Sequence, residues 1–440
     1  MQLKRMPCQL ERAFLSTLAT ATLTALQLCP ASSSSAAPYQ AFSADSFVDS
    51  IGVGVHLTYG NTPYARFDDL IKSKLLELGI RHIRDGAHNE SDYLDKIKAL
   101  ASVGIKSQLI FQGTKPDEIL EVLSKASGAV DAAEGPNESD LEMFNFTYKG
   151  QKFPDGTRIY QKELHHAITS DPSTKSLPVV LPSVGWGENA DRAGQMSDLG
   201  DYCNLHSYPA LANKPTHDID SYFIPHALNM CGDKPLMVTE TGYHNAVNDP
   251  ESSSGISELA AGKYIPRMLL ENFNRKIKRT FLYEFINEST DSDSEANFGL
   301  LRYDGSAKPA YTAIKNIISL LKSNRTDFKP VSLDYTLSGD HKDIKSTLLQ
   351  KSDGTFFLIL WQDADSWNTE TKKDITVAPL DIKLSLTNPA TKVEIYAPLK
   401  STSATKTLAD VKDIQVQVPD FPIIVRLVLG RGSLTVIEAK

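Results

Sequence analysis

Two carboxylates in this sequence follow short apolar runs and are flanked by residues that suit acid–base chemistry. Glu138 comes directly after Asn137, behind the run at 129–133, and Glu240 follows the run at 236–239. Two facing carboxyl groups can cleave a glycosidic bond, because one protonates the leaving oxygen while the other attacks or supports the anomeric carbon. The residue types therefore predict a catalytic carboxylate pair.

Other polar or aromatic residues also end apolar runs and are candidates for contact with a sugar. Asn137 could hydrogen-bond a sugar 2-hydroxyl, and His206 or Tyr208 could orient Glu240. Trp186 could stack on a sugar ring through its face. The remaining candidates for substrate binding are His56, Arg84, Tyr243 and Glu284.

Each candidate also has a structural interpretation. Glu138 could be a solvated loop acid or a helix cap, and Glu240 could be an ion-pair partner of Arg84. Glu284 could form an internal ion pair, and the histidine and tryptophan candidates could serve packing alone. Glu134 precedes Glu138 by four residues, and we expect it to be a buried, hydrogen-bonded supporting carboxylate.

The elements that must position these residues are eight short apolar runs alternating with longer amphipathic stretches. The predicted strands are 52–57, 81–84, 106–111, 129–133, 179–183, 202–206, 236–239 and 280–285. The predicted helices are 70–78, 93–101, 116–125, 163–169, 255–274 and 308–321. A right-handed series of this kind predicts an eight-stranded parallel (β/α)8 TIM barrel, whose chemistry lies where the strands end. A doubly wound open sheet is the competing architecture.

The domain organisation follows from shifts in pattern along the chain. Residues 1–37 carry three basic residues, an uncharged Leu/Ala/Thr-rich stretch and a small polar end, which is typical of a signal peptide. Residues 38–50 form an N-terminal segment that could pack on either domain, and 51–323 form the barrel. Residues 324–440 contain short alternating segments separated by turn residues, which predicts an antiparallel β-sandwich.

Together the motifs resemble clan A of the glycoside hydrolases, a group of retaining (β/α)8 enzymes, some of which carry a C-terminal sandwich. The matching features are Asn137-Glu138, Thr239-Glu240-x-Gly242, His206-Ser-Tyr208 and the segment 297–311 before the last helix. The resemblance implies Glu138 as general acid/base, Glu240 as nucleophile of a double displacement, and Arg84 as the arginine beneath the nucleophile. The sequence departs from the clan at 283–285, near the usual place of a subsite tryptophan. The resemblance therefore does not identify which sugar is the substrate.

Charge and composition narrow the classes of partner. The formal charge is −8 over 440 residues, so there is no basic surplus to bind nucleic acid. Removing 1–37 takes away three basic residues and one acid and changes the charge to −10. No other stretch is long and apolar enough to span a membrane. We therefore expect a secreted or periplasmic monomer that acts on a poly- or oligosaccharide.

Two cysteines remain after the signal peptide, Cys203 and Cys231, and both are predicted at the noncatalytic ends of neighbouring strands. We expect them to form a structural disulfide. No dinucleotide, phosphate-loop or zinc motif is present, so we expect no cofactor and no metal. The alternative functions are a noncatalytic carbohydrate-binding or cell-surface protein on a glycosidase-like barrel and a metal-dependent barrel hydrolase.

Overall fold

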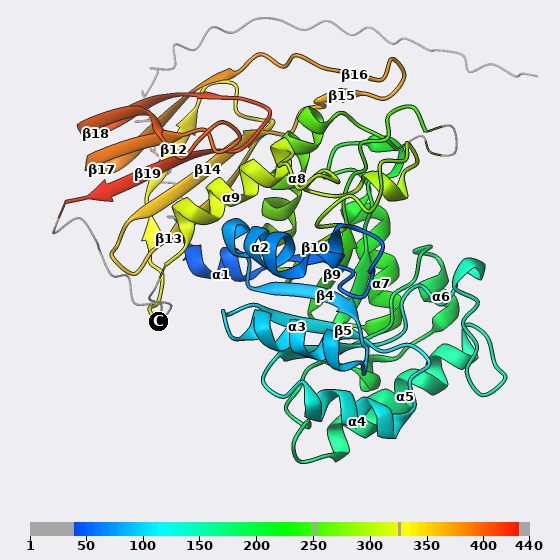
Figure 1. The fold of residues 1–440 in the computed structure, drawn as a ribbon. Coiled ribbons are helices and arrows are strands. Elements are labelled where there is room, and N and C mark those ends of the chain that lie inside the picture. The colour runs from blue at the N-terminus through cyan, green and yellow to red at the C-terminus, as the bar shows by residue number, and fades with distance from the viewer. Residues whose placement is uncertain (1–38, 250–251, 253, 324–326, 431–440) are drawn as a thin grey trace, which may run out of the picture. The chain divides into compact units, whose positions relative to one another are not determined.

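The computed structural model describes residues 39–249, 252, 254–323 and 327–430 (Figure 1). The predicted signal peptide at 1–37 lies outside the described residues. Among the described residues, no helix has the length and apolar character needed to cross a membrane. The described residues belong to one compact unit.

Eight parallel strands form the predicted barrel. They are β3 (Ile51–Gly54), β4 (His82–Gly86), β5 (Lys106–Ile110), β6 (Val130–Glu134), β7 (Val179–Val180), β8 (Cys203–His206), β9 (Leu236–Thr241) and β10 (Thr280–Leu282). Each strand pairs with its neighbour in the chain from β3 to β7 and from β8 to β10, and β10 pairs with β3. A parallel bridge between Val180 and Tyr202 joins the β7 and β8 sides. The prediction of a barrel is therefore confirmed, and an open sheet is excluded.

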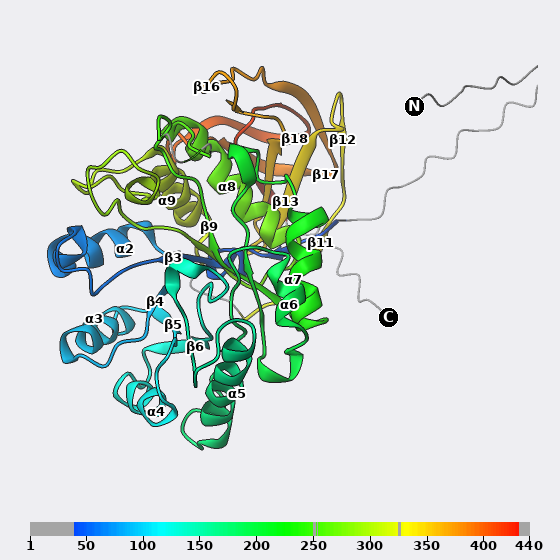
Figure 2. The ribbon, with the colours of Figure 1, turned by 90° about the vertical axis from the view of Figure 1, so that its right-hand side faces the viewer.

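Helices surround these strands (Figure 2). They are α2 (Lys72–Leu78), α3 (Ser91–Ala101), α4 (Pro116–Lys125), α5 (Asp155–Ser170), α6 (Asn189–Ala193), α7 (Ile224–Cys231), α8 (Glu258–Asn274) and α9 (Pro309–Leu321). In α3 the buried residues Tyr93, Leu94, Ile97 and Leu100 share one face, which is the spacing that an amphipathic helix needs to cover a sheet. The helices α6 and α7 were not predicted, and the five residues of α6 are too few to display a 3.6-residue period.

The C-terminal sheet folds over to make the antiparallel sandwich. Its strands are β12 (Tyr335–Ser338), β13 (Ile344–Gln350), β14 (Phe356–Gln362), β17 (Leu380–Tyr396), β18 (Ala404–Val418) and β19 (Ile423–Leu429). The first part of β17 pairs with β12 and the second with β19, and the register shifts between Ser385 and Ala390. One long strand thus contributes to both layers, and Leu360, Leu384 and Val425 belong to the hydrophobic core of this sheet.

The N-terminal segment contributes edge strands to the C-terminal sheets. Strand β1 (Tyr39–Gln40) pairs with β11 (Ser332–Leu333), and β2 (Phe42–Ser43) pairs with β13. Helix α1 (Ala44–Asp49) then leads into β3. A short hairpin of β15 (Trp367–Asn368) and β16 (Lys373–Asp374) completes the strands. The sequence left open which domain this segment joins, and the pairings assign its strands to the C-terminal sheets.

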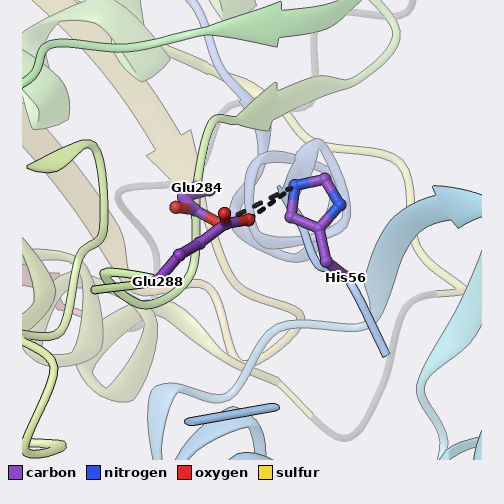
Figure 3. A group of neighbouring side chains, drawn as sticks. All are labelled: His56, Glu284 and Glu288. Atoms are coloured by element: carbon purple, nitrogen blue, oxygen red, sulfur yellow. Dashed lines mark ion pairs between the residues drawn. The ribbon is translucent and has the colours of Figure 1, made fainter. Parts of the chain in front are cut away.

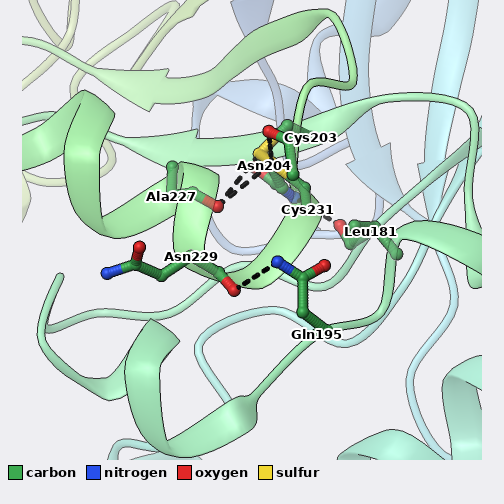
Figure 4. Close-up of a disulfide and its surroundings, with 8 residues drawn as sticks. Leu181, Gln195, Cys203, Asn204, Ala227, Asn229 and Cys231 are labelled. Carbon is green, nitrogen blue, oxygen red and sulfur yellow. Dashed lines mark hydrogen bonds between the residues drawn. A yellow bond between two sulfur atoms is a disulfide. The ribbon is translucent and has the colours of Figure 1, made fainter.

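A disulfide connects the start of β8 to the end of α7 (Figure 4). The sulfurs of Cys203 and Cys231 are bonded, and their Cα atoms are 5.4 Å apart. Both side chains are completely buried. The bond lies at the amino-terminal end of β8, opposite the end that carries His206.

Candidate active site

Arg84 links the carboxylates at the carboxyl ends of the barrel strands. Arg84 lies within β4, and its side chain is 4% exposed. Its Nη1 donates to Glu240 Oε1 at 2.5 Å, while Nε and Nη2 each donate to Glu134 at 2.8 Å. This bidentate contact fixes the guanidinium plane. The buried Glu134 therefore holds the guanidinium of Arg84, which in turn positions Glu240 by its direct hydrogen bond.

Glu134 has the supporting role that the sequence suggested. It is completely buried, and Gln108 and Asn204 also donate to it, at 2.7 and 2.9 Å. Burial alone would raise the pKa of Glu134, but the charge and hydrogen bonds of Arg84 outweigh burial and lower it. Glu134 thus stays ionised as the counter-ion of Arg84.

Glu240, at the end of β9, is held as a carboxylate. Tyr208 donates its hydroxyl to Glu240 Oε2 at 2.9 Å, opposite the bond from Arg84. Burial would raise the pKa of Glu240, but the charges of His206 and Arg84 lower it to about 2. Gly242, two residues on, is needed because a Cβ there would lie 2.3 Å from the carbonyl oxygen of Tyr283.

Glu138 follows β6 on a strained turn. Its φ of 41° lies in the left-handed region that residues other than glycine adopt rarely, often at functional sites. Its backbone N–H donates to Ser183 Oγ at 3.0 Å, and the N–H of Asn137 donates to Gln112 Oε1 at 3.0 Å. These bonds hold the turn so that the Glu138 side chain meets His206.

His206 and Glu138 share one proton. Asn204 donates its NH2 to Glu134 and to the carbonyl of Leu181, so its Oδ1 accepts the Thr239 hydroxyl proton at 2.5 Å. The Thr239 oxygen must then accept a hydrogen bond from His206 Nε2, 3.0 Å away. The 2.7 Å contact between His206 Nδ1 and Glu138 Oε1 therefore contains a single proton. It belongs either to the carboxylic acid or to an imidazolium.

The Glu138–His206 pair faces Glu240 directly. One oxygen of each glutamate and one ring nitrogen of His206 all lie within 4.8 Å of one another. His206 Nδ1 is 3.6 Å from Glu240 Oε2. Burial would lower the pKa of His206, but the Glu240 charge and the contact with Glu138 raise it. The site thus combines a shared proton with a carboxylate whose lowered pKa favours its ionised form.

A second cluster is formed by His56 after β3 and by Glu284 and Glu288 after β10 (Figure 3). His56 Nε2 is 3.7 Å from Glu284 Oε2 and 3.6 Å from Glu288 Oε1. The Tyr64 hydroxyl donates to Glu284 Oε2 at 3.1 Å. Burial and the charge of Glu288 raise the pKa of Glu284 well above its usual value, while burial lowers that of His56 to about 4.

Two predicted substrate contacts lie outside both clusters. Trp186 is 61% exposed on the loop after β7, where Asp140 accepts its backbone N–H at 3.2 Å. Tyr243 is buried, packs against Tyr264 and donates its hydroxyl to the carbonyl of Asn213 at 2.7 Å. The structure thus leaves Trp186 free to meet a ligand, whereas Tyr243 is committed to the core.

Sequence reasoning missed Asn204 and Thr239 as members of the site. A signal was present, because Asn204 precedes His206 by two residues and side chains two apart share a face of a strand. Glu288 and Tyr64 were missed as well, since no strand ending pointed to either residue. Glu288 lies on a loop and Tyr64 lies on a short 3-10 turn at Pro63–Ala65. The sequence pattern does not predict the paths of such segments.

Comparison with known proteins gives a match only at the level of structure. No protein-family model matches the sequence, and no curated protein matches it. A family 39 glycoside hydrolase from Bacteroides cellulosilyticus WH2 superposes with a TM-score of 0.59 at 17% identity, over 87% of this chain and 82% of that one. A monomeric β-xylosidase from Caulobacter crescentus CB15 gives 0.56 at 14% identity, over 89% and 98%. These likenesses establish a shared barrel-and-sandwich fold.

Proposed function

We propose that the protein is a secreted, retaining glycoside hydrolase that cleaves O-glycosidic bonds of a poly- or oligosaccharide. The observation that carries the proposal is the facing pair of Glu138 and Glu240, with carboxylate oxygens within 4.8 Å. Retaining enzymes place their two carboxyl groups about 5 to 5.5 Å apart, whereas inverting enzymes leave about 6.5 to 9.5 Å for a water molecule. The short separation favours direct attack by a carboxylate.

In the first step Glu240 attacks the anomeric carbon. Arg84 and Tyr208 each donate to one of its oxygens, which keeps the group ionised and fixes its direction. At the same time Glu138 delivers the proton that it shares with His206 to the leaving oxygen. The products are a glycosyl ester on Glu240 and a released alcohol.

In the second step the same groups act in reverse. Once Glu240 is esterified its negative charge is gone. Glu138 as a carboxylate then removes a proton from water, whose oxygen bonds to the anomeric carbon while the ester bond to Glu240 breaks, which releases the sugar and restores the Glu240 carboxylate. His206 can accept that proton through its contact with Glu138. The Glu138–His206 pair thus returns to its one-proton state after each turnover.

Asn137 binds the 2-hydroxyl of the sugar in this proposal. Its Oδ1 accepts a hydrogen bond from Arg84 at 2.6 Å, so the NH2 group is directed away from Arg84. An NH2 donor beside the acid can form a hydrogen bond to the 2-hydroxyl that strengthens as the transition state forms.

The two glycoside hydrolases that share this fold support the same reaction class, which is hydrolysis of a glycosidic bond.

The test is hydrolysis by the purified protein without residues 1–37 on a panel of aryl β-glycosides and polysaccharides. Glu240→Gln should lower kcat/KM by roughly 10⁴-fold or more, because a neutral amide cannot form the glycosyl ester. Glu138→Gln should lose most activity on substrates with poor leaving groups, and less on activated aryl glycosides.

The matched control is Glu370→Gln, which makes the same change at an exposed site in the C-terminal domain. It should hydrolyse every substrate at the rate of the parent protein. Unchanged activity of Glu240→Gln would contradict the proposal. A chain that binds sugars but hydrolyses none of them would favour a noncatalytic carbohydrate-binding protein.

A further inference from the structure

The cluster of His56, Glu284 and Glu288 brings an imidazole nitrogen and two carboxylates together from different parts of the chain (Figure 3). One ligand atom of each residue lies within 4.8 Å of the other two. Glu284 is completely buried, whereas His56 and Glu288 have side chains that are 23% and 24% exposed. The cluster is therefore anchored in the core and open on one side.

Three polar atoms of this cluster are buried and lack a hydrogen-bond partner. They are His56 Nε2, Glu284 Oε1 and Glu288 Oε1. Tyr64 donates to Glu284 only at Oε2. Leaving several ionisable groups buried and unsatisfied in one place is costly, and native proteins avoid it unless a ligand supplies the missing interactions. His56 Nε2 faces Glu288 Oε1 at 3.6 Å and Glu284 Oε2 at 3.7 Å, and a cation bound between the three residues would give each of them a partner.

The spacing of the three residues identifies the kind of ligand. Hydrogen-bonded groups would lie about 2.7 to 3.2 Å apart, and acceptors around one ammonium group would lie about 4.7 Å apart. Ligands at about 2.0 to 2.2 Å from a tetrahedral metal ion lie about 3.4 Å from one another. His56 Nε2 lies 3.6 Å from Glu288 Oε1 and 3.7 Å from Glu284 Oε2, the oxygen that also accepts from Tyr64, and these separations are closest to the metal geometry.

We propose that His56, Glu284 and Glu288 bind one divalent first-row metal ion of the zinc type. One imidazole and two carboxylates suit Zn²⁺, Co²⁺ or Mn²⁺ better than Ca²⁺ or Mg²⁺, which prefer oxygen ligands alone. Tyr64 orients the carboxylate of Glu284, as partners of metal ligands commonly do. The exposed side of the cluster leaves a coordination position for water or a substrate hydroxyl.

The neighbouring group of Glu138, His206 and Glu240 is also compact enough for an ion, but its atoms are already engaged. Arg84 and Tyr208 donate to the two oxygens of Glu240, and both ring nitrogens of His206 have partners. An ion there would have to displace the guanidinium. This contrast assigns the ion to the His56 cluster.

Ion binding is measured without any sugar, so its failure would leave the proposed glycosidase function intact. Chelator-treated protein is titrated with Zn²⁺ in a calorimeter and with Co²⁺ in a visible spectrometer, where tetrahedral coordination gives intense d–d bands. We expect one ion per chain. His56→Ala and Glu288→Gln should each weaken binding at least about 100-fold, and Tyr64→Phe about 10-fold.

Glu138→Gln is the matched control, since it removes one carboxylate from the other compact group. It should bind Zn²⁺ like the parent protein. Glu288 is on a partly exposed loop, so Glu288→Gln tests the site even if His56→Ala fails to fold. Equal Zn²⁺ affinity of the parent and Glu288→Gln proteins, no binding by the parent, or loss of binding in Glu138→Gln would each overturn the proposal.

Discussion

At the residue scale, one buried guanidinium controls the charge of the site. Arg84 donates to Glu240, Glu134 and Asn137, which come from two strand ends. Burying Arg84 without these carboxylates would be prohibitive, and burying the carboxylates without Arg84 would be prohibitive as well. Since Glu134 is completely buried and Glu240 is 13% exposed, the contact excludes most solvent. The fold thus holds Glu240 in the ionised form that the proposed nucleophilic attack requires.

We expect Arg84→Met to destabilise the protein by about 3 to 5 kcal/mol, because it leaves two buried carboxylates without a counter-charge. The lowered pKa of Glu240 gives stability that is present above its unfolded value and is lost as pH falls toward about 2. In Arg84→Met this loss should begin at higher pH. Urea unfolding at several pH values measures both effects, and an unchanged pH profile would contradict this account.

His206 provides a second residue-scale prediction, on the pH dependence of kcat/KM. Because the pKa of His206 is raised, the shared proton stays bound at pH values above the usual pKa of histidine. Activity should therefore fall at alkaline pH, where that proton leaves. In His206→Asn the alkaline limb should move to lower pH, while the acid limb, set by Glu240, should not move. A purely structural role would lower activity equally at every pH.

At the element scale, the positions of the eight strands could be predicted because short apolar runs alternate with longer amphipathic stretches. The barrel and the neighbouring positions of Glu138, Glu240, His206 and Arg84 follow from strand order. The loops could not be predicted, and they place Glu288 and Tyr64 beside His56. Tyr243 shows the same limit, since it follows Glu240 by three residues but turns into the core.

The disulfide between β8 and α7 supports an element-scale prediction. It closes a loop with a sequence separation of 28, and loop-closure entropy gives about 3 to 4 kcal/mol for a loop of this size. The double variant Cys203→Ser with Cys231→Ser should lose about that much stability in urea unfolding. Two titratable thiols in the denatured, unreduced chain that begins at residue 38 would show that the bond does not form in solution.

At the scale of the whole molecule, helix α8 ties the barrel to the C-terminal domain. Arg267 is 1% exposed and donates to Asp363 Oδ1 at 3.0 Å and to the carbonyl of Ala364 at 2.8 Å. Lys263 contacts Asp420 at 2.8 Å. Trp361, from β14, belongs to the same hydrophobic core as the barrel residues. These contacts predict that the two parts depend on one another for folding.

We expect a chain of residues 38–323 to be insoluble or to lack a cooperative thermal transition, because it exposes the apolar and charged groups that now face the C-terminal domain. Thermal unfolding by circular dichroism and soluble yield measure this outcome. The full chain from residue 38 should unfold in one transition. A folded isolated barrel with that same transition temperature would show that the parts are independent.

The central claim is that Glu240 becomes covalently glycosylated, and trapping that intermediate tests it most directly. A 2-deoxy-2-fluoro aryl glycoside of an accepted sugar slows both steps, because fluorine destabilises the oxocarbenium-like transition state. Intact-protein and peptide mass spectrometry should show one sugar adduct, on the peptide that contains Glu240, and none in Glu240→Gln. An adduct on another residue, or turnover of the parent substrate with inverted anomeric configuration, would contradict the account.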